Sequence, residues 1–413
     1  MIKPKIRFKG YQEEWEQRKL IDVCDYVDYR GKTPIKTDSG VFLVTAKNVK
    51  DGYIDYGASQ EYISEDDYEE VMHRGKPEIG DVLITTEAPC GNVAQVNRAD
   101  IALAQRIIKY RGQSNIVDNT YLKYYLLSPE FQNILNAKSS GGTVKGIKGS
   151  ILHQQEIKYP KYEEQFKIGS YFNNLDHLIT LHHRKCEETK ILKKYMLQKM
   201  FPQNGNSVPE IRFWGFTEDW EQRKLGEVIE GVSKKNTDGL YTQDDILACS
   251  LGTELDRKTI FYGLRSTEDS VKSYRIVNIG NVIYTKSPIK GYPNGIVRTC
   301  KIVDGIVPSL YCVYKKKENI SIPIDTRFIQ SYLEDKGRLA QYLCPLVNVG
   351  ARNNVNITDK EFLEGVIKIP MTVEEQTKIV DALEKINHLI TLHQKKCDEL
   401  QNIKKFMLQN MFI

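Results

Sequence analysis

Two His-x-x-x-Cys pairs are the residues of this chain best suited to metal chemistry. His182 precedes Cys186 by four residues, and His393 precedes Cys397 by the same spacing. On a helix this spacing places both side chains on one face, so four ligands could bind zinc where two such helices cross. Alternatively, the four residues are semi-polar fillers that set the register of a helix pair. We favour the second interpretation and expect no metal ion in this chain.

A second group of residues could contact nucleic acid. The segment 138–150, KSSGGTVKGIKGS, carries lysines among glycine and hydroxyl residues and contains no acidic residue. Lysines on a glycine-rich loop can approach a phosphate backbone closely. The segment 348–356, NVGARNNVN, offers an arginine, which can read guanine, and asparagines, which can read adenine. A solvated flexible loop is the alternative for both segments. The candidate residues are Lys138, Thr143, Lys145, Lys148, Arg352, Asn353 and Asn354.

Three shorter turns carry similar residues, and each is a weak signal on its own. They supply Arg30, Lys32 and Thr33 in RGKTP, Lys47 and Asn48 in TAKN, and Lys286, Lys290, Tyr292 and Asn294 in TKSPIKGYPNG. Residues 21–162 hold 17 basic and 19 acidic side chains, and residues 226–370 hold 20 and 17. Any face that binds nucleic acid must therefore be a local basic patch on a surface of mixed charge.

Composition and motifs argue against several other classes of protein. The 413 residues carry a net charge of +5, and no run of 18 apolar residues could cross a bilayer. The first ten residues lack the apolar stretch of a secretory signal. The eight cysteines form no C-x-x-C pair, which fits reduced thiols in a cytoplasm. The sequence contains no P-loop, G-x-G-x-x-G fingerprint, G-x-S-x-G elbow or [ND]-P-P-Y tetrapeptide, so we expect no catalysis by this chain.

An internal repeat must position these residues. KIRFKGYQEEWEQRKL at 5–20 returns as EIRFWGFTEDWEQRKL at 210–225, with 11 of 16 positions identical. The 39-residue segment that begins at Glu163 matches the segment that begins at Glu374 at 21 positions. The inserts between these blocks show no comparable match. A framework used twice with two different inserts predicts one mechanical task performed on two different targets.

Both 39-residue segments predict long helices, because they lack internal proline and are rich in Leu, Lys, Glu, Gln and Met. Apolar and semi-polar residues recur at steps of three or four, which suits pairing of the two helices. The seam residues are Leu175, Ile179, His182, Cys186, Thr189, Leu192, Met196 and Met200 in the first segment, and Ile386, Ile390, His393, Cys397, Leu400, Ile403, Met407 and Met411 in the second. A pseudo-twofold relation between the halves would make the helices antiparallel, and roughly 30 to 35 helical residues would give a rod of about 45 to 52 Å.

Each insert alternates short apolar runs with Gly, Asn, Asp and Pro turns, which predicts twisted sheets beside short helices. We expect an α+β protein with domains at 1–162 and 205–373 and long helices within 163–204 and 374–413. Trp15 and Trp220, equivalent in the two repeats, either pin each insert onto a helix or contact a partner. The methionines at the helix ends either pack in a core or form an adaptable docking face.

With these features in view, the chain resembles a known family, the DNA specificity subunits of type I restriction-modification systems. The likeness rests on the block I-R-F-x-G-[YF]-x-E-x-W-E-Q-R-K-L, the E-E-Q before each helix, and the helix ending K-K-[YF]-M-L-Q-x-M-F. Each motif occurs twice, and the likeness covers essentially the whole chain.

The resemblance implies two target recognition domains, each reading one half of a split, asymmetric sequence in double-stranded DNA, with the helices as an antiparallel coiled-coil ruler. It also implies a non-catalytic subunit that recruits two modification (methyltransferase) subunits and two restriction (translocase/nuclease) subunits. S-adenosylmethionine, ATP and Mg would then be bound by those partners. We place the partner-binding surfaces around Trp15, Leu181, Trp220 and Leu392.

Two alternatives remain open at this point. The chain could be a scaffold that displays two protein-binding domains without contacting DNA, which the salt dependence of duplex binding would test. It could also be a stand-alone restriction or modification enzyme with fused recognition domains, which an assay of adenine methylation by the isolated chain would test.

Overall fold

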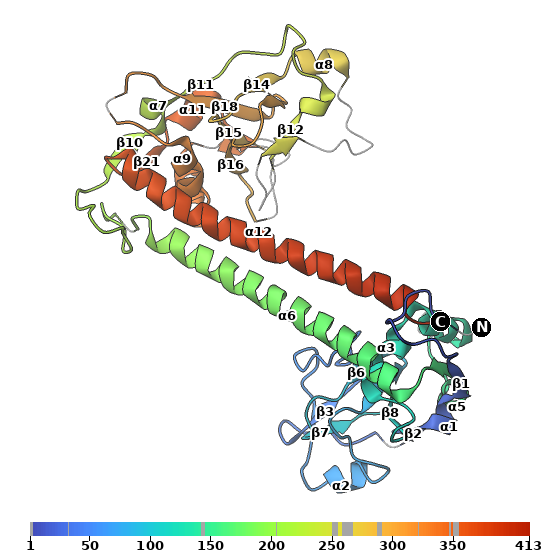
Figure 1. The fold of residues 1–413 in the computed structure, drawn as a ribbon. Coiled ribbons are helices and arrows are strands. Elements are labelled where there is room, and N and C mark those ends of the chain that lie inside the picture. Colours follow the sequence, from blue (N-terminus) through green and yellow to red (C-terminus); the bar gives the residue numbers. More distant parts are fainter. Residues whose placement is uncertain are drawn as a thin grey trace. The chain divides into compact units, whose positions relative to one another are not determined.

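The computed structural model describes residues 3–31, 33–141, 145–203, 205–249, 255–257, 267–286, 291–320, 322–346, 348–349 and 355–413. The chain divides into two compact units. Unit 1 is formed by Met1–His183 together with Gln394–Ile413, and unit 2 by Arg184–His393. The two long helices, α6 (Tyr162–Lys199) and α12 (Val373–Asn410), each contribute to both units (Figure 1). The predicted α+β fold with two long helices is confirmed, and each helix has 38 residues.

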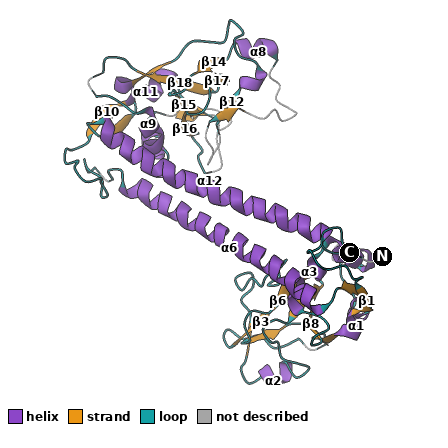
Figure 2. Cartoon of the chain, viewed as in Figure 1, coloured by secondary structure: helices purple, strands orange, loops and turns teal. Residues whose placement is uncertain are grey.

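Unit 1 is built on a four-stranded antiparallel sheet in the order β2-β8-β5-β6, with a three-stranded sheet in the order β4-β3-β7. Figure 2 shows strands of unit 1 beside one end of α6. Its strands are β1 (Glu16–Lys19), β2 (Cys24–Asp28), β3 (Val41–Val44), β4 (Tyr62–Ile63), β5 (Val82–Thr86), β6 (Cys90–Gln95), β7 (Ile101–Leu103), β8 (Ile107–Gly112) and β9 (Glu156–Tyr159). Its shorter helices are α1 (Leu20–Val23), α2 (Tyr68–Val71), α3 (Asn119–Leu127), α4 (Pro129–Lys138) and α5 (Gly149–His153).

Unit 2 repeats the four-stranded antiparallel sheet, in the order β11-β18-β15-β16. Its strands are β10 (Glu221–Lys224), β11 (Ile229–Gly231), β12 (Leu247–Ala248), β13 (Asp256–Arg257), β14 (Arg275–Val277), β15 (Val282–Thr285), β16 (Ile296–Thr299), β17 (Gly305–Val307), β18 (Tyr311–Lys316), β19 (Asn348–Val349), β20 (Val355–Asn356) and β21 (Val366–Ile369). Its helices are α7 (Leu225–Val228), the 3-10 helix η1 (Gln243–Asp245), α8 (Glu268–Lys272), α9 (Thr326–Leu333), α10 (Lys336–Leu343) and α11 (Asp359–Leu363).

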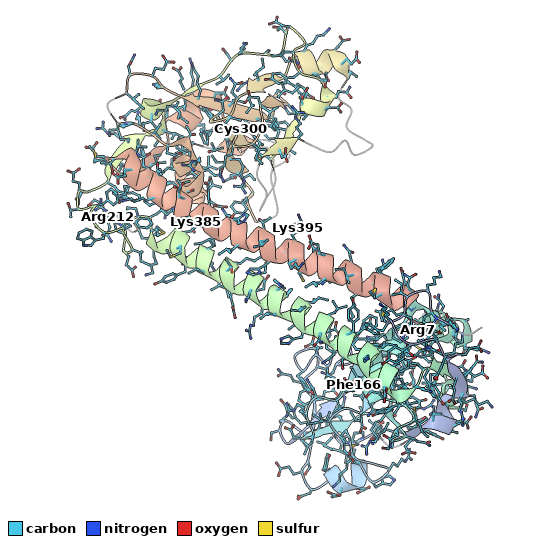
Figure 3. The ribbon with its side chains drawn as sticks, in the orientation of Figure 1. Arg7, Phe166, Arg212, Cys300, Lys385 and Lys395 are labelled. Atoms are coloured by element: carbon cyan, nitrogen blue, oxygen red, sulfur yellow. The ribbon has the colours of Figure 1, made fainter. Side chains whose placement is uncertain are left out.

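The repeated I-R-F and E-E-Q motifs form a charged clamp in each unit. Arg7 donates two hydrogen bonds of 2.7 Å to the carboxylate of Glu164 at the start of α6. Arg212 does the same to Glu375 at the start of α12, at 2.7 and 2.9 Å. Both glutamates are almost fully buried, and Figure 3 labels the arginine of each clamp. Since a buried charge requires a partner, the clamp explains why both members of the pair are repeated.

The glutamine of each E-E-Q motif fastens the long helix to a shorter one. Gln165 accepts a hydrogen bond from the N–H of Asp118, the N-cap of α3, at 2.9 Å. Gln376 accepts one from the N–H of Asp325, the N-cap of α9, at 2.8 Å. The strand pairs β1-β9 and β10-β21 close the same region of each unit. The repeated residues are therefore the framework that carries each insert.

The two repeated tryptophans lie in the unit cores. Trp15 packs edge-on against Tyr121, and Trp220 packs against Phe328 and donates its indole N–H to Glu375 at 3.2 Å. Both side chains are about 3% exposed. The helix ends fill the same cores, with Met411 and Phe412 in unit 1 and Met200 and Phe201 in unit 2. These contacts support the structural interpretation of the tryptophans and the core interpretation of the methionines.

The helix seam can be followed separately in each unit. In unit 1, the thiol of Cys397 lies 3.9 Å from the carbonyl oxygen of Ile179, and Lys404 pairs with Asp176 at 2.5 Å. The two sequences run in opposite directions through these contacts, so the helices are antiparallel there. In unit 2, the thiol of Cys186 lies 3.8 Å from the carbonyl oxygen of Ile390.

The seam prediction is wrong at two equivalent positions. Leu192 and Ile403 are exposed, and the following lysines, Lys193 and Lys404, take the inward positions. Lys193 pairs with Glu334 at 2.7 Å. The reason is that the last turns of each long helix pack on a globular core, so their inner face is not the face that a second helix would contact.

Contacts at the two cysteines support their role as seam residues. Both thiols are buried and donate to backbone carbonyls of the facing helix. Within the described ranges, no group of three or more His, Cys, Asp and Glu side chains is arranged to bind a metal ion. In the same part of the chain, no helix is long and apolar enough to span a membrane.

Candidate nucleic-acid interface

Several loops of unit 1 meet at one end of its main sheet. β5 ends at Thr86, whose N–H donates to the carbonyl oxygen of Arg106 in the turn between β7 and β8, at 2.9 Å. β3 runs parallel to β7, and the N–H of Ala104 donates to the carbonyl of Val44 at 2.9 Å. The turns after β3, β5 and β7 therefore lie together where the four-stranded and three-stranded sheets end, and we call this region the loop end of unit 1.

The glycine-rich segment lies against this loop end. Gly146 forms β-bridges with Glu87 and with Ser140, and the N–H of Ile147 donates to the carbonyl of Thr86 at 2.9 Å. The lysines predicted to contact DNA, Lys138, Lys145 and Lys148, are exposed along this segment and at the end of α4. The structure thus brings them to one edge of the sheet, while Thr143 lies outside the described residues.

Two further predicted residues reach the same region. Arg30 pairs with Asp28 at 2.6 Å, and both side chains lie so close to Gly149 that an added Cβ there would collide with them. Burial would raise the pKa of Asp28, but the hydrogen bonds and charge of Arg30 lower it below its usual range. Thr33 accepts a hydrogen bond from the side chain of Gln105 at 2.9 Å. Lys32 lies outside the described residues.

The two predicted residues after β3 differ in whether their side chains are accessible to DNA. Lys47 is exposed. Asn48 is 0% exposed, and its amide accepts from Thr45 and donates to the carbonyls of Asp55 and Ser59 at 2.8 to 2.9 Å. Its side chain therefore holds the loop together and leaves no polar atom for DNA in this structure.

Sequence reasoning missed three residues at the loop end. Gln105 and Arg106 occupy the turn between β7 and β8, and Glu87 follows β5. Arg106 pairs with Glu87 at 3.3 Å, and both side chains are about half exposed. No glycine or asparagine marks the turn at Arg106, so the sequence carried no signal for it.

In unit 2, the predicted residues that the structure describes, Lys286, Tyr292 and Asn294, lie between β15 and β16. The N–H of Lys286 donates to the carbonyl of Leu310 at 3.2 Å, which repeats the bond between Thr86 and Arg106. The hydroxyl of Tyr292 donates to the carbonyl of Glu334 at 3.3 Å, and the carbonyl of Asn294 accepts from a tyrosine hydroxyl at 2.7 Å. The residues Lys290, Arg352, Asn353 and Asn354 lie outside the described ones.

The residues predicted to contact partner subunits fall into two groups. The buried rings of Trp15 and Trp220 present no surface to a partner. Leu392 is half exposed and Leu181 is partly buried. Other exposed apolar residues accompany them at positions that are equivalent in the repeat: Leu178, Ile403 and Phe406 in unit 1, and Leu389, Leu192 and Tyr195 in unit 2. Each unit therefore carries the same set of apolar positions on its segments of the long helices, and we call each set a helix patch.

Comparison with known proteins identifies relatives of the chain. Residues 12–190 match the family model described as "Type I restriction modification DNA specificity domain". The chain is 24% identical over 412 residues to the type I restriction enzyme MjaVIII specificity subunit of Methanocaldococcus jannaschii, covering 95% of this chain and 91% of that protein. It is 27% identical over 244 residues to the MjaIX specificity subunit of the same organism, which is 54% of each chain.

A solved structure shares the fold. The S subunit of a type I restriction-modification system from M. genitalium superposes with a TM-score of 0.64 at 12% identity, covering 100% of this chain and 99% of that one. Together with the relatives, these matches confirm the resemblance to the DNA specificity subunits of type I restriction-modification systems.

Proposed function

We propose that this chain, whose residues 12–190 belong to the type I restriction modification DNA specificity domain family, binds a split, asymmetric target in double-stranded DNA, each unit reading one half. One observation carries the proposal. The two units have the same order of sheet strands but different side chains at the equivalent end, with Arg106 in unit 1 where unit 2 has Leu310. One framework with two different contact surfaces fits a target whose halves differ in sequence.

In this proposal the exposed lysines of the glycine-rich segment bind phosphates. Lys145 and Lys148 flank Gly146, whose lack of a side chain lets this segment lie against the end of β5, where an added Cβ would be 3.3 Å from the carbonyl oxygen of Thr86. Phosphate contacts position the protein on DNA without carrying sequence information. Bases would then be read by residues in the neighbouring turns.

Duplex binding by the full chain at several salt concentrations tests this assignment. We expect log affinity to fall linearly with log salt, and the variant Lys145→Ala/Lys148→Ala to reduce the slope by roughly 2, about 0.9 for each phosphate contact. Lys161→Ala, an exposed lysine of the same unit that pairs with Glu13, serves as the matched control. Binding that does not depend on salt would favour the protein-binding scaffold instead.

An exchange of one insert tests the division of labour. When residues 226–365 are replaced by the corresponding insert of a relative, selection from a random duplex library should change one half of the recovered sequence and leave the other half unchanged. A change in both halves, or in neither, would contradict the proposal that each unit reads its own half-site.

The long helices are proposed to set the spacing between the half-sites. Insertion of seven residues after His183 and again after His393 adds about 10.5 Å of helix at each place. We expect the spacer in the selected DNA to lengthen by about three base pairs, since B-DNA rises about 3.4 Å per base pair. An unchanged spacer length would refute the proposal that the long helices set the distance between the half-sites.

The helix patches are proposed to bind two modification subunits, one on each unit, with two restriction subunits in the larger complex. Catalysis, and with it S-adenosylmethionine, ATP and Mg, would belong to those partners. All eight cysteines are free thiols, which fits the cytoplasmic location we propose. The isolated chain should not methylate adenine, and native mass spectrometry of the mixture should show two modification subunits for each copy of this chain.

A further inference from the structure

Arg106 occupies an unfavourable backbone conformation at the loop end of unit 1. Its φ of +78° lies in the left-handed region, which a bulky side chain rarely adopts. Ala88, in the neighbouring turn, has a φ of +50°. The other described non-glycine residues with positive φ, Asn115 and Asn319, are of a type that tolerates this region. Strain of this kind persists only where surrounding structure imposes it, and it gathers at functional sites.

The side chain of Arg106 is held by one ion pair, but not all of its hydrogen-bond donors have a partner in the described part of the chain. Its Nε lies 3.3 Å from a carboxylate oxygen of Glu87, and about half of each side chain is exposed. In the part of the chain that the structure describes, its two terminal amino groups have no hydrogen-bond partner. By contrast, the guanidinium of Arg111 is fully engaged by Asp81 and Glu78. Arg106 therefore presents a free, preoriented fork of donors.

The surroundings of this fork suit contact with a duplex. Glu87 bridges to Gly146, which places the fork beside the segment that carries Lys145 and Lys148. Gln105, the preceding residue, is tied to Thr33. Flanking lysines can neutralise phosphates, while a planar fork with fixed orientation matches two acceptors on one base.

We infer that Arg106 reads a guanine in the half-site bound by unit 1. Its two terminal amino groups would donate to O6 and N7 of the guanine in the major groove, and Glu87 acts as the positioning residue for the guanidinium. The inference rests on the proposed function and adds the kind of base that one unit recognises. Unit 2 has Leu310 at the equivalent strand end, so an arginine at this position recognises guanine only in the half-site bound by unit 1.

Selection of duplexes from a random library by the full chain tests the inference. Arg106→Gln should lose the preference for guanine at one position, by roughly ten- to a hundred-fold, without affecting the half-site of unit 2. Arg106→Lys should retain part of the preference, because one donor still reaches the base edge. Glu87→Gln should weaken the preference at the same position and no other.

Arg98→Gln provides a matched control. Arg98 is also exposed and paired with an acid, Asp100, but it follows the opposite end of β6 from the loop end. Its replacement should leave the selected sequence unchanged. Retained recognition of the second half-site by each variant shows that the protein is folded.

Two outcomes overturn the inference and can be told apart. If Arg106→Gln weakens binding to all duplexes equally and lowers the salt slope by about 1, Arg106 contacts a phosphate and reads no base. If the unmodified chain selects no sequence at all, the proposed function fails, and the inference fails with it.

Discussion

Units 1 and 2 each contain a turn of the same geometry, but the charged residues around this turn differ between the units. Gly80 and Gly280 both adopt positive φ before a sheet strand, and both donate N–H bonds of 2.8 Å across the sheet. The next residue, Asp81 or Asn281, accepts a backbone N–H of the turn at 2.8 or 2.9 Å. Both units keep this side-chain hydrogen bond as well as the backbone bonds, so the turn requires a side-chain oxygen and not a charge.

Around that turn, unit 1 has a network of buried charges, whereas two of the equivalent described positions in unit 2 are uncharged. Asp81 is 1% exposed and pairs with Arg111 at 2.6 Å and with Lys109 at 3.4 Å. By strand register the positions of Asp81 and Lys109 are taken in unit 2 by Asn281 and Val313. The same sheet therefore accepts either charged or uncharged side chains at these positions, provided that each buried polar group has a partner. Inserts can therefore diverge beyond recognition in sequence while the framework stays the same.

The largest expected effect comes from breaking what the units share. Glu375→Ala should lower the stability of unit 2 by about 3–5 kcal/mol, because it leaves the guanidinium of Arg212, 14% exposed, without its counter-charge and removes the acceptor of the Trp220 indole. Glu164→Ala should destabilise unit 1 by removing the counter-charge of Arg7. Scanning calorimetry should show each variant lowering the melting transition of its own unit.

The exposed neighbour Glu374 supplies the control for the clamp. Its side chain is largely exposed and pairs with Lys378 one helical turn away, so Glu374→Ala should change stability little. An equal loss from Glu374→Ala and Glu375→Ala would show that the clamp is not what stabilises the unit.

A smaller effect should follow from making unit 1 resemble unit 2. Asp81→Asn should cost about 2–4 kcal/mol, because Lys109, 5% exposed, loses its counter-charge. Asp81→Asn/Lys109→Val recreates the pair found in unit 2 and should recover most of this loss. Urea unfolding of the single and double variants measures both values, and a double variant less stable than Asp81→Asn would contradict the equivalence of the two sites.

Equivalent changes in the helix patches should have equal effects on partner binding. Phe406→Ser in unit 1 and Tyr195→Ser in unit 2 each remove a half-exposed aromatic side chain. Each should weaken binding of one modification subunit by about tenfold, since aromatic anchors carry much of an interface energy. Titration calorimetry should then resolve one weakened and one unchanged site, and loss of both sites in either variant would mean that the patches are not independent.

The smallest expected difference is in acid stability. Burial would raise the pKa of Asp81, but hydrogen bonds from Arg111 and from the Glu78 N–H, with the charge of Lys109, lower it below 3.8. The stabilisation from this carboxylate is therefore complete above its ordinary pKa and is lost as the pH falls through the lowered folded value. Acid titration followed by calorimetry should show unit 1 losing stability in that range, and Asp81→Asn should abolish this part of the loss.

The sequence predicted the framework better than the candidate site. It placed Cys186 and Cys397 in the helix seam, and Arg30, Lys145 and Lys148 in turns that the structure brings together. It missed Glu87 and Arg106, because their role depends on a turn at Arg106 that contains no glycine or asparagine to indicate it. It also could not show that Asn48 is used internally, since burial of a polar side chain depends on what folds over it.

Periodicity and repetition alone determined that this protein has two long helices, two sheet-containing inserts and one framework used twice, because those features are recorded in residues close together in the chain. Only the tertiary structure showed that the two inserts, dissimilar in sequence, form sheets with the same strand order. It also decided which loops meet at the end of each sheet and which side chains there remain available to a ligand. Those outcomes depend on pairing between strands far apart in sequence, and local residue patterns do not encode such pairing.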